Sequence, residues 1–161
     1  MRPLPLLPAV IALAACGRAP ERPAEPPPAV PATIAVADFR YLAHLDGAWR
    51  GTGPDSLVFY ERYRLADDST IVSYTYGTDS TLTAAVDSGD IRWSGGQVRT
   101  GSPTARWVAT HWSADSVRFD PDIGATNSFT WIRRSADAWM ARLDSPGGPA
   151  PTVYEMTRVG E

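Results

Sequence analysis

A carboxylate lies on an otherwise apolar face of the clearest strand in the sequence. In the run 57–65, alternation places Glu61 between Phe59 and Tyr63 on one face, and the arginines of the run on the other. A buried carboxylate is costly unless it is paired. We therefore expect a cationic partner, and the candidates are Arg106, Arg133 and Arg142. Glu61 is then either a polar handle at the floor of a cavity or half of a buried ion pair.

One histidine and several tryptophans are the other side chains that could contact a ligand. In the predicted strand 106–112, alternation places Trp107 and His111 on one face, and Trp131 belongs to another predicted strand. An inward His111 could contact a ligand or a metal, whereas the structural alternative is a histidine hydrogen-bonded within the fold. Tryptophans on strands could line an aromatic pocket or fill a solid barrel. The candidate ligand-binding residues are Glu61, Trp107, His111 and Trp131.

The composition excludes several chemistries. All 15 basic residues are Arg, so the chain has no lysine for a P-loop or a Schiff base. One Cys and two His can hardly supply the four ligands of a structural zinc site, and one Cys forms no disulfide within the chain. The net charge of −3 and the lack of a basic stretch argue against nucleic acid. We predict no catalytic residue, no metal and no cofactor.

The first residues are typical of a targeting signal. A positive start is followed by an apolar run, 4–15, that is too short to span a bilayer as a helix. It ends in Leu13-Ala14-Ala15-Cys16, which resembles the lipobox of bacterial lipoproteins. The resemblance implies a signal peptide over 1–15 and a diacylglycerol on Cys16, which would anchor the chain to a bilayer without spanning it. The alternative is an ordinary secretory signal with a chance Cys. The Gly that follows Cys16 implies the outer membrane, facing the periplasm.

A tether is predicted between the anchor and one folded domain. Residues 16–36 hold the lipidated Cys and a Pro-rich stretch without an aromatic residue, which cannot bury enough apolar surface to fold. In polyproline II geometry the stretch would reach on the order of 60 Å. All aromatic residues lie between Phe39 and Tyr154, so the domain is assigned to 37–161.

The pattern of the domain predicts one short helix followed by an all-β fold. Apolar residues three apart predict a helical segment over 38–45 with Asp38 as its N-cap. Short β-prone runs joined by turns then follow, and no crossover helix separates them, which indicates an up-and-down barrel or a sandwich. The predicted strands are 57–65, 70–76, 80–87, 91–93, 97–100, 106–112, 116–119, 129–134, 139–143 and 152–159.

The segment before these strands favours the barrel. Leu45-Asp46-Gly47-Ala48-Trp49-Arg50-Gly51, with Glu61-Arg62-Tyr63 beyond it, resembles a group of uncharacterised bacterial lipocalin-like (calycin) domains. The resemblance implies an antiparallel up-and-down barrel of about eight to ten strands. It also implies that Trp49 packs at the closed end under an Arg from the last strand, for which Arg158 is the candidate. Residues 47–53 are also similar to the opening of the haem-binding nitrobindin family, but no His follows His111 to hold haem iron.

Three functions are consistent with these patterns. The first is a membrane-anchored, non-catalytic protein that binds a small apolar or amphipathic ligand in the barrel. The second is an envelope protein-interaction module with a solid barrel. The third is a calycin-type enzyme with Glu61 and His111 as acid–base partners, which requires both side chains to reach a common point in a cavity.

Overall fold

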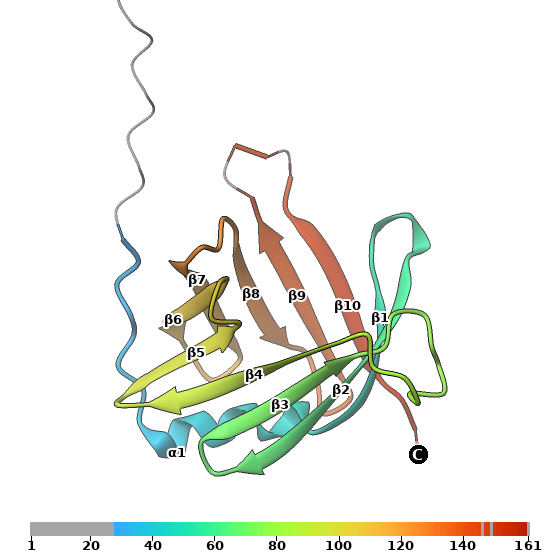
Figure 1. Cartoon of the computed structure of the whole chain (residues 1–161), viewed down its shortest axis with the longest axis horizontal. Coiled ribbons are helices and arrows are strands. Elements are labelled where there is room, and N and C mark those ends of the chain that lie inside the picture. Colours follow the sequence, from blue (N-terminus) through green and yellow to red (C-terminus); the bar gives the residue numbers. More distant parts are fainter. Residues whose placement is uncertain (1–27, 146, 149, 161) are drawn as a thin grey trace, which may run out of the picture.

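A computed structural model of the chain describes residues 28–145, 147–148 and 150–160. The predicted signal peptide, Cys16 and the first part of the tether lie outside the described residues. Ten antiparallel strands form a closed barrel in which each strand pairs with its neighbours in sequence and β1 pairs with β10 (Figure 1). This confirms the predicted all-β, up-and-down barrel with a short N-terminal helix.

The strands follow the period-two pattern of a sheet with one buried face. In β7, Val117 and Phe119 are buried, whereas Arg118 and Asp120 between and after them lie on the outer face. The elements in chain order are α1 (Val36–Phe39), η1 (Arg40–Leu45), β1 (Gly47–Thr52), η2 (Pro54–Ser56), β2 (Val58–Asp67), β3 (Thr70–Thr75), β4 (Asp87–Ser94), β5 (Gln97–Gly101), β6 (Arg106–Trp112), β7 (Ser116–Ile123), β8 (Ser128–Arg133), β9 (Ala138–Asp144) and β10 (Thr152–Arg158).

The helical segment packs against one end of the barrel, at the bottom of Figure 1. The three apolar side chains that predicted the segment, Phe39, Leu42 and Leu45, are at most 1% exposed. The segment begins two residues earlier than predicted, and it starts after Ala35, which makes no side-chain cap. The N-cap role predicted for Asp38 is therefore wrong: Asp38 lies inside α1, and the second half of the segment is a 3₁₀ helix.

Trp49 and Arg158 meet where the first and last strands pair. The two residues are directly opposite each other in the β1–β10 ladder, and the guanidinium carbon lies 4.4 Å from the centre of the indole ring. The Trp49 side chain is fully buried and donates its N–H to the Leu45 carbonyl at 2.6 Å. Arg158 donates to the carbonyls of His44 and Asp46, both at 2.7 Å. One guanidinium thus joins the last strand to the helical segment and covers the indole.

Sterics explain why the first residue of the Gly-x-Trp motif is a glycine. Gly47 has a φ of +124°, and a Cβ at this position would collide with the Arg158 guanidinium. The motif is therefore part of the same closure: glycine leaves room for the cation that stacks on the tryptophan two residues later.

The end of the predicted tether belongs to the folded domain. The Ala32 amide donates to the Ala109 carbonyl and the Ile34 amide to the Gly96 carbonyl, both at 2.8 Å. Ile34 is 2% exposed, and the Trp93 indole donates to its carbonyl. The predicted boundary at residue 37 is therefore too late, because the Pro-rich composition of 16–36 concealed a single apolar anchor near its end.

Two strand predictions are wrong, although the number of strands agrees. Residues 80–86 form a loop instead of a strand, and the structure adds β1, which was not among the predicted strands. Asp79 organises the loop by accepting hydrogen bonds from the amides of Thr81 and Thr83, and Leu82 takes a positive φ of 55°. The hydrogen bond from the Thr81 hydroxyl, followed by those from the two amides, holds the pKa of the Asp79 carboxyl well below its usual range. Within the described part of the chain, no helix combines the length and the apolar character needed to cross a membrane.

Candidate ligand-binding cavity

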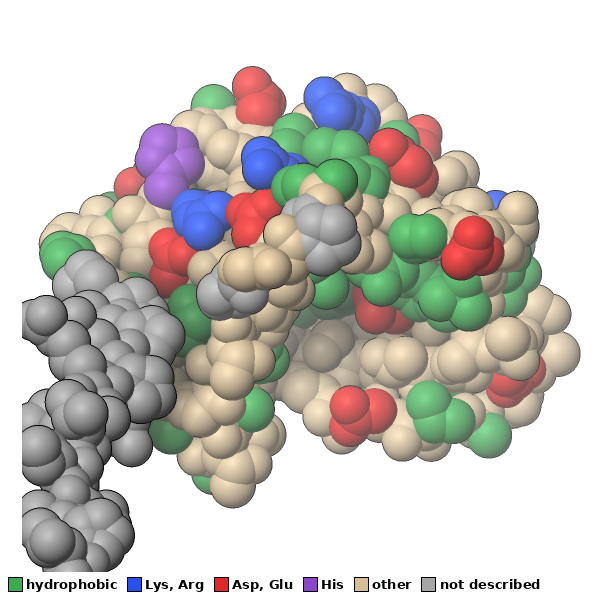
Figure 2. All heavy atoms as spheres, turned by 90° about the horizontal axis from the view of Figure 1, so that it is seen from above, with side chains coloured by type: hydrophobic (Ala, Val, Ile, Leu, Met, Phe, Trp, Pro, Cys, Tyr) green, Lys and Arg blue, Asp and Glu red, His purple; other side chains and the backbone are tan. Residues whose placement is uncertain are grey.

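The barrel holds an open cavity of about 420 Å³. Seen from above, the side opposite α1 in Figure 1, the molecule is hollowed and hydrophobic side chains gather around the hollow (Figure 2). The strands that line the cavity are mainly β2, β8, β9 and β10. The lining residues are Phe59, Glu61, Tyr63, Trp107, Asn127, Phe129, Trp131, Trp139, Ala141, Leu143, Tyr154 and Met156.

Aromatic side chains make up most of the cavity wall. Alternation on β8 points Phe129 and Trp131 inward, and their ring centres are 5.5 Å apart. Trp139 of β9 continues the row at 5.6 Å from Trp131, and Trp107 of β6 extends it at 5.7 Å from Phe129. Such tilted and edge-to-face contacts are the preferred geometry of aromatic pairs. The row fixes the shape of one wall, while Ala141, also on β9, leaves open space beside it.

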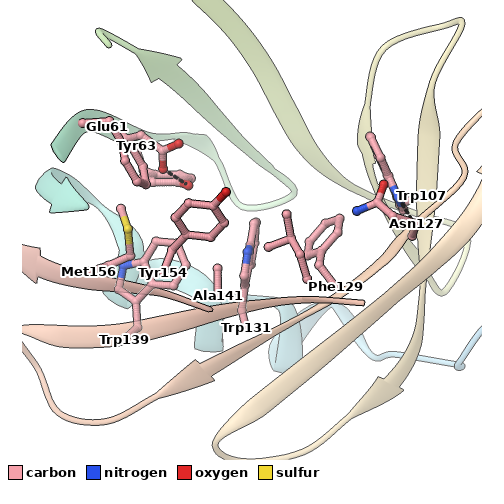
Figure 3. Close-up of a pocket in the computed structure, with 12 residues that line it drawn as sticks. Glu61, Tyr63, Trp107, Asn127, Phe129, Trp131, Trp139, Ala141, Tyr154 and Met156 are labelled. Carbon is pink, nitrogen blue, oxygen red and sulfur yellow. Dashed lines mark hydrogen bonds between the residues drawn. The ribbon is translucent and has the colours of Figure 1, made fainter. Parts of the chain in front are cut away.

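Glu61 projects into this cavity as predicted, but its partner is not an arginine. The Tyr63 hydroxyl, two residues along the same face of β2, donates to a Glu61 carboxylate oxygen at 2.7 Å (Figure 3). Burial raises the pKa of Glu61, and the hydrogen bond from Tyr63 offsets part of that rise. Burial, followed by the nearby carboxylate, raises the pKa of Tyr63 well above its ordinary value, so the phenol keeps the proton that it donates.

The three arginines predicted as partners of Glu61 are engaged elsewhere. Arg106 pairs with Asp122 at 3.0 Å and Arg142 with Asp144 at 3.2 Å, while Arg133 lies over the Tyr41 ring at 5.7 Å. Arg106 and Arg142 have the opposite parity from the cavity-lining residues of their strands, which places them on the outer wall. Arg133 shares the parity of Phe129 and Trp131, but it is the last residue of β8 and lies near the helical segment. Among residues 28–145, 147–148 and 150–160, no ion pair includes Glu61. The prediction of a cationic partner within the chain is wrong.

Trp107 lies at the far side of the cavity from Glu61. Its indole N–H donates to the Asn127 carbonyl at 2.7 Å, which fixes the ring against the loop before β8. Figure 3 shows Glu61 and Tyr63 on one side of the cavity and Trp107 and Asn127 on the other, with Trp131 between them. The cavity is therefore polar at its two sides and aromatic between them.

His111 does not line the cavity. A β-bulge in the β6–β7 ladder between Ala109 and His111 shifts the alternation by one residue, so His111 is exposed and Trp112 turns toward the core. The ligand-binding role predicted for His111 and its acid–base pairing with Glu61 are both wrong for the same reason. Strict alternation cannot anticipate a bulge, which reverses the face of every later residue in the strand.

Three of the four predicted ligand-binding residues, Glu61, Trp107 and Trp131, line one cavity. Several lining residues were not predicted as sites. The inward parity of β8, β9 and β10 would have indicated Phe129, Leu143 and Tyr154, whereas nothing in the sequence marks Asn127, which lies in a loop. Within the described ranges, no group of three or more His, Cys, Asp or Glu side chains could hold a metal ion.

No protein-family model and no curated protein matches the chain. Among solved structures, a redesigned β-barrel named b11L5F_LGL is 14% identical with a TM-score of 0.41, and the match covers 75% of this chain and 96% of that chain. A structure of EF1p2_mFAP2b bound to DFHBI is 16% identical with a TM-score of 0.35, and the match covers 74% of this chain and 98% of that one. The barrel topology of this chain rests on the strand pairing described above.

Proposed function

We propose that the chain is a membrane-anchored, non-catalytic, lipocalin-like protein that binds a small apolar or amphipathic molecule inside its barrel. The cavity carries this proposal. Its volume of about 420 Å³ lies within the range of about 300–1,000 Å³ typical of small-molecule sites. Its wall combines many aromatic side chains with a few polar groups, which is the usual composition of such sites.

The size of the cavity favours ligand binding over the other two predicted functions. An interaction module with a solid barrel would fill its interior with its own side chains, and this barrel does not. An enzyme built on Glu61 and His111 would need both groups at one point, whereas the two lie on opposite faces of the wall. A binding protein needs neither a nucleophile nor a second titratable group beside Glu61.

The membrane anchor in this proposal is supported by the sequence alone. Acylation of Cys16 would hold the barrel at the outer membrane, facing the periplasm, with the Pro-rich segment before Ala32 as a spacer. The stacking of Arg158 on Trp49 supports the lipocalin-like part of the proposal, since the resemblance implied this pair. Fractionation tests the anchor: the wild-type chain should sediment with membranes, and Cys16→Ser should release it from them or leave it unprocessed and without lipid.

The binding experiment uses 1-naphthylmethanol, a neutral probe with an apolar body. The full-length protein in nanodiscs of zwitterionic lipid should show saturable quenching of tryptophan fluorescence, with empty nanodiscs as the blank. Ala141→Leu adds bulk inside the cavity and should weaken binding strongly, whereas Thr157→Leu adds the same side chain to an exposed position on β10 and should not. Absence of saturable binding to the wild-type protein, or equal binding to both variants, would contradict ligand binding in the barrel.

A further inference from the structure

We infer that the ligand is a protonated primary or secondary amine with an apolar body, whose ammonium group binds the Glu61 carboxylate between aromatic rings. This inference rests on the proposed function and names the class of ligand that the same cavity takes.

The first observation is the charge of the cavity. Glu61 is the one formally charged side chain among the twelve that line it. Arg118 of β7 is paired on the outer face, where it contacts Asp120 and Asp144 at 2.9 Å each. An ionised Glu61 therefore gives the interior a single negative charge with no counter-ion from the described chain.

The second observation is the unused hydrogen-bonding capacity of this carboxylate. An ionised carboxylate has about four lone-pair positions, and the Tyr63 hydroxyl occupies one of them. Among the described residues, no other hydrogen bond to the Glu61 carboxylate is found. The carboxyl group borders the cavity, so the remaining positions are available to a donor inside it. A primary or secondary ammonium carries N–H donors for these positions, whereas a quaternary ammonium carries none.

The third observation is the set of rings around the carboxylate. The Tyr63 ring, whose hydroxyl holds Glu61, lies 6.1 Å from Trp139 and 6.4 Å from Trp131, centre to centre. Aromatic faces attract a cation through their quadrupole, and tryptophan does so most strongly. The burial that raises the pKa of Glu61 also shows that an unpaired anion is unfavourable here, so a bound cation would restore the ionised form.

The rest of the cavity suits an apolar body. Beyond Trp131, the lining turns to Phe129, Leu143 and Trp107, and Figure 3 shows Phe129 and Trp107 on the side away from Glu61. An anionic head group would meet the Glu61 charge without a cation to offset it. A neutral alcohol would form a hydrogen bond with Glu61 but would gain neither charge pairing nor a cation–π contact.

Three naphthalene probes of similar size separate these classes. They are 1-naphthylmethylamine, which is protonated at neutral pH, 1-naphthylmethanol and 1-naphthoate, each titrated into the full-length protein in zwitterionic nanodiscs. The wild-type protein should bind the amine at least about tenfold more tightly than the alcohol, which corresponds to one charge-assisted hydrogen bond. It should bind the naphthoate most weakly.

Two variants test whether Glu61 causes the preference for the amine over the alcohol. Glu61→Gln keeps the shape of the side chain but removes its charge, and should bind amine and alcohol equally. Glu155→Gln removes the same charge from an exposed position on β10 and should keep the preference. Thermal unfolding of both variants checks that each is folded.

The outcomes distinguish this inference from the proposed function. If the wild-type protein binds the alcohol as tightly as the amine, or if Glu61→Gln keeps the amine preference, the amine inference is wrong and ligand binding stands. If none of the probes binds, the proposed function fails, and the inference fails with it.

Discussion

Replacing Arg158 by Ala should cost the barrel about 3 kcal/mol of unfolding free energy. The guanidinium stacks on the fully buried Trp49 indole at 4.4 Å, and such a contact contributes about 1 kcal/mol. It also donates two hydrogen bonds of 2.7 Å to carbonyls at the end of the helical segment, each worth about 1 kcal/mol after allowance for the partial exposure of the side chain. Its contact with Asp137 adds little to this sum, because that carboxylate is 75% exposed.

The assay is urea unfolding of the full-length protein, followed by tryptophan fluorescence. Arg158→Lys should recover less than half of the loss, because an ammonium cannot stack flat on the indole and reach both carbonyls at once. The control is Arg92→Ala, which removes an exposed pair with Asp90 and should cost less than about 1 kcal/mol. If Arg158→Ala costs no more than the Arg92 control, the pair does not close the barrel.

Three further predictions concern the cavity and its surroundings. Folding raises the pKa of Glu61 above its ordinary 4.5, so the folded chain keeps a proton that the unfolded chain loses as the pH rises past that value. The stability of the wild-type protein relative to Glu61→Gln should therefore be level below pH 4.5 and fall as the pH rises toward the pKa of the folded state. A constant difference in urea unfolding between pH 4 and 8 would contradict the buried carboxylate. Affinity for 1-naphthylmethylamine should fall as the pH drops and Glu61 is protonated, whereas affinity for 1-naphthylmethanol should stay constant in the same titration. His111→Ala should change the affinity for either probe by less than about twofold, since the side chain is exposed outside the barrel wall. A larger loss of affinity would mean that His111 contributes to the binding site.

The sequence was sufficient to predict the barrel and three of the side chains that line its cavity, Glu61, Trp107 and Trp131. Alternation along β2, a local pattern of residue type, placed Glu61 and Tyr63 inward. The pairing of Trp49 with Arg158 was implied by the resemblance to lipocalin-like domains. The lack of crossover helices indicated a barrel or a sandwich, and the resemblance to lipocalin-like domains favoured the closed barrel.

Two of the features that were missed depend on contacts between distant parts of the chain. The bulge that turns His111 outward arises from the pairing of β6 with β7. The anchoring of Ile34 depends on Trp93 and Gly96, which follow it by about sixty residues in the sequence. The partner of Glu61 was sought among arginines because a buried carboxylate is commonly paired with a cation. In the structure its partner is the Tyr63 hydroxyl, two residues away on the same strand. The pairing of β6 with β7 and the contacts of Ile34 leave no local pattern in a single sequence, whereas Glu61 and Tyr63 are neighbours on one face of β2.

A structure of the full-length protein with 1-naphthylmethylamine bound would test the function most directly. We expect the naphthalene rings between Trp131 and Phe129, and the amine nitrogen about 3 Å from the Glu61 carboxylate oxygens. A probe bound only on the outer wall, or an interior filled by the chain's own side chains, would contradict ligand binding in the barrel.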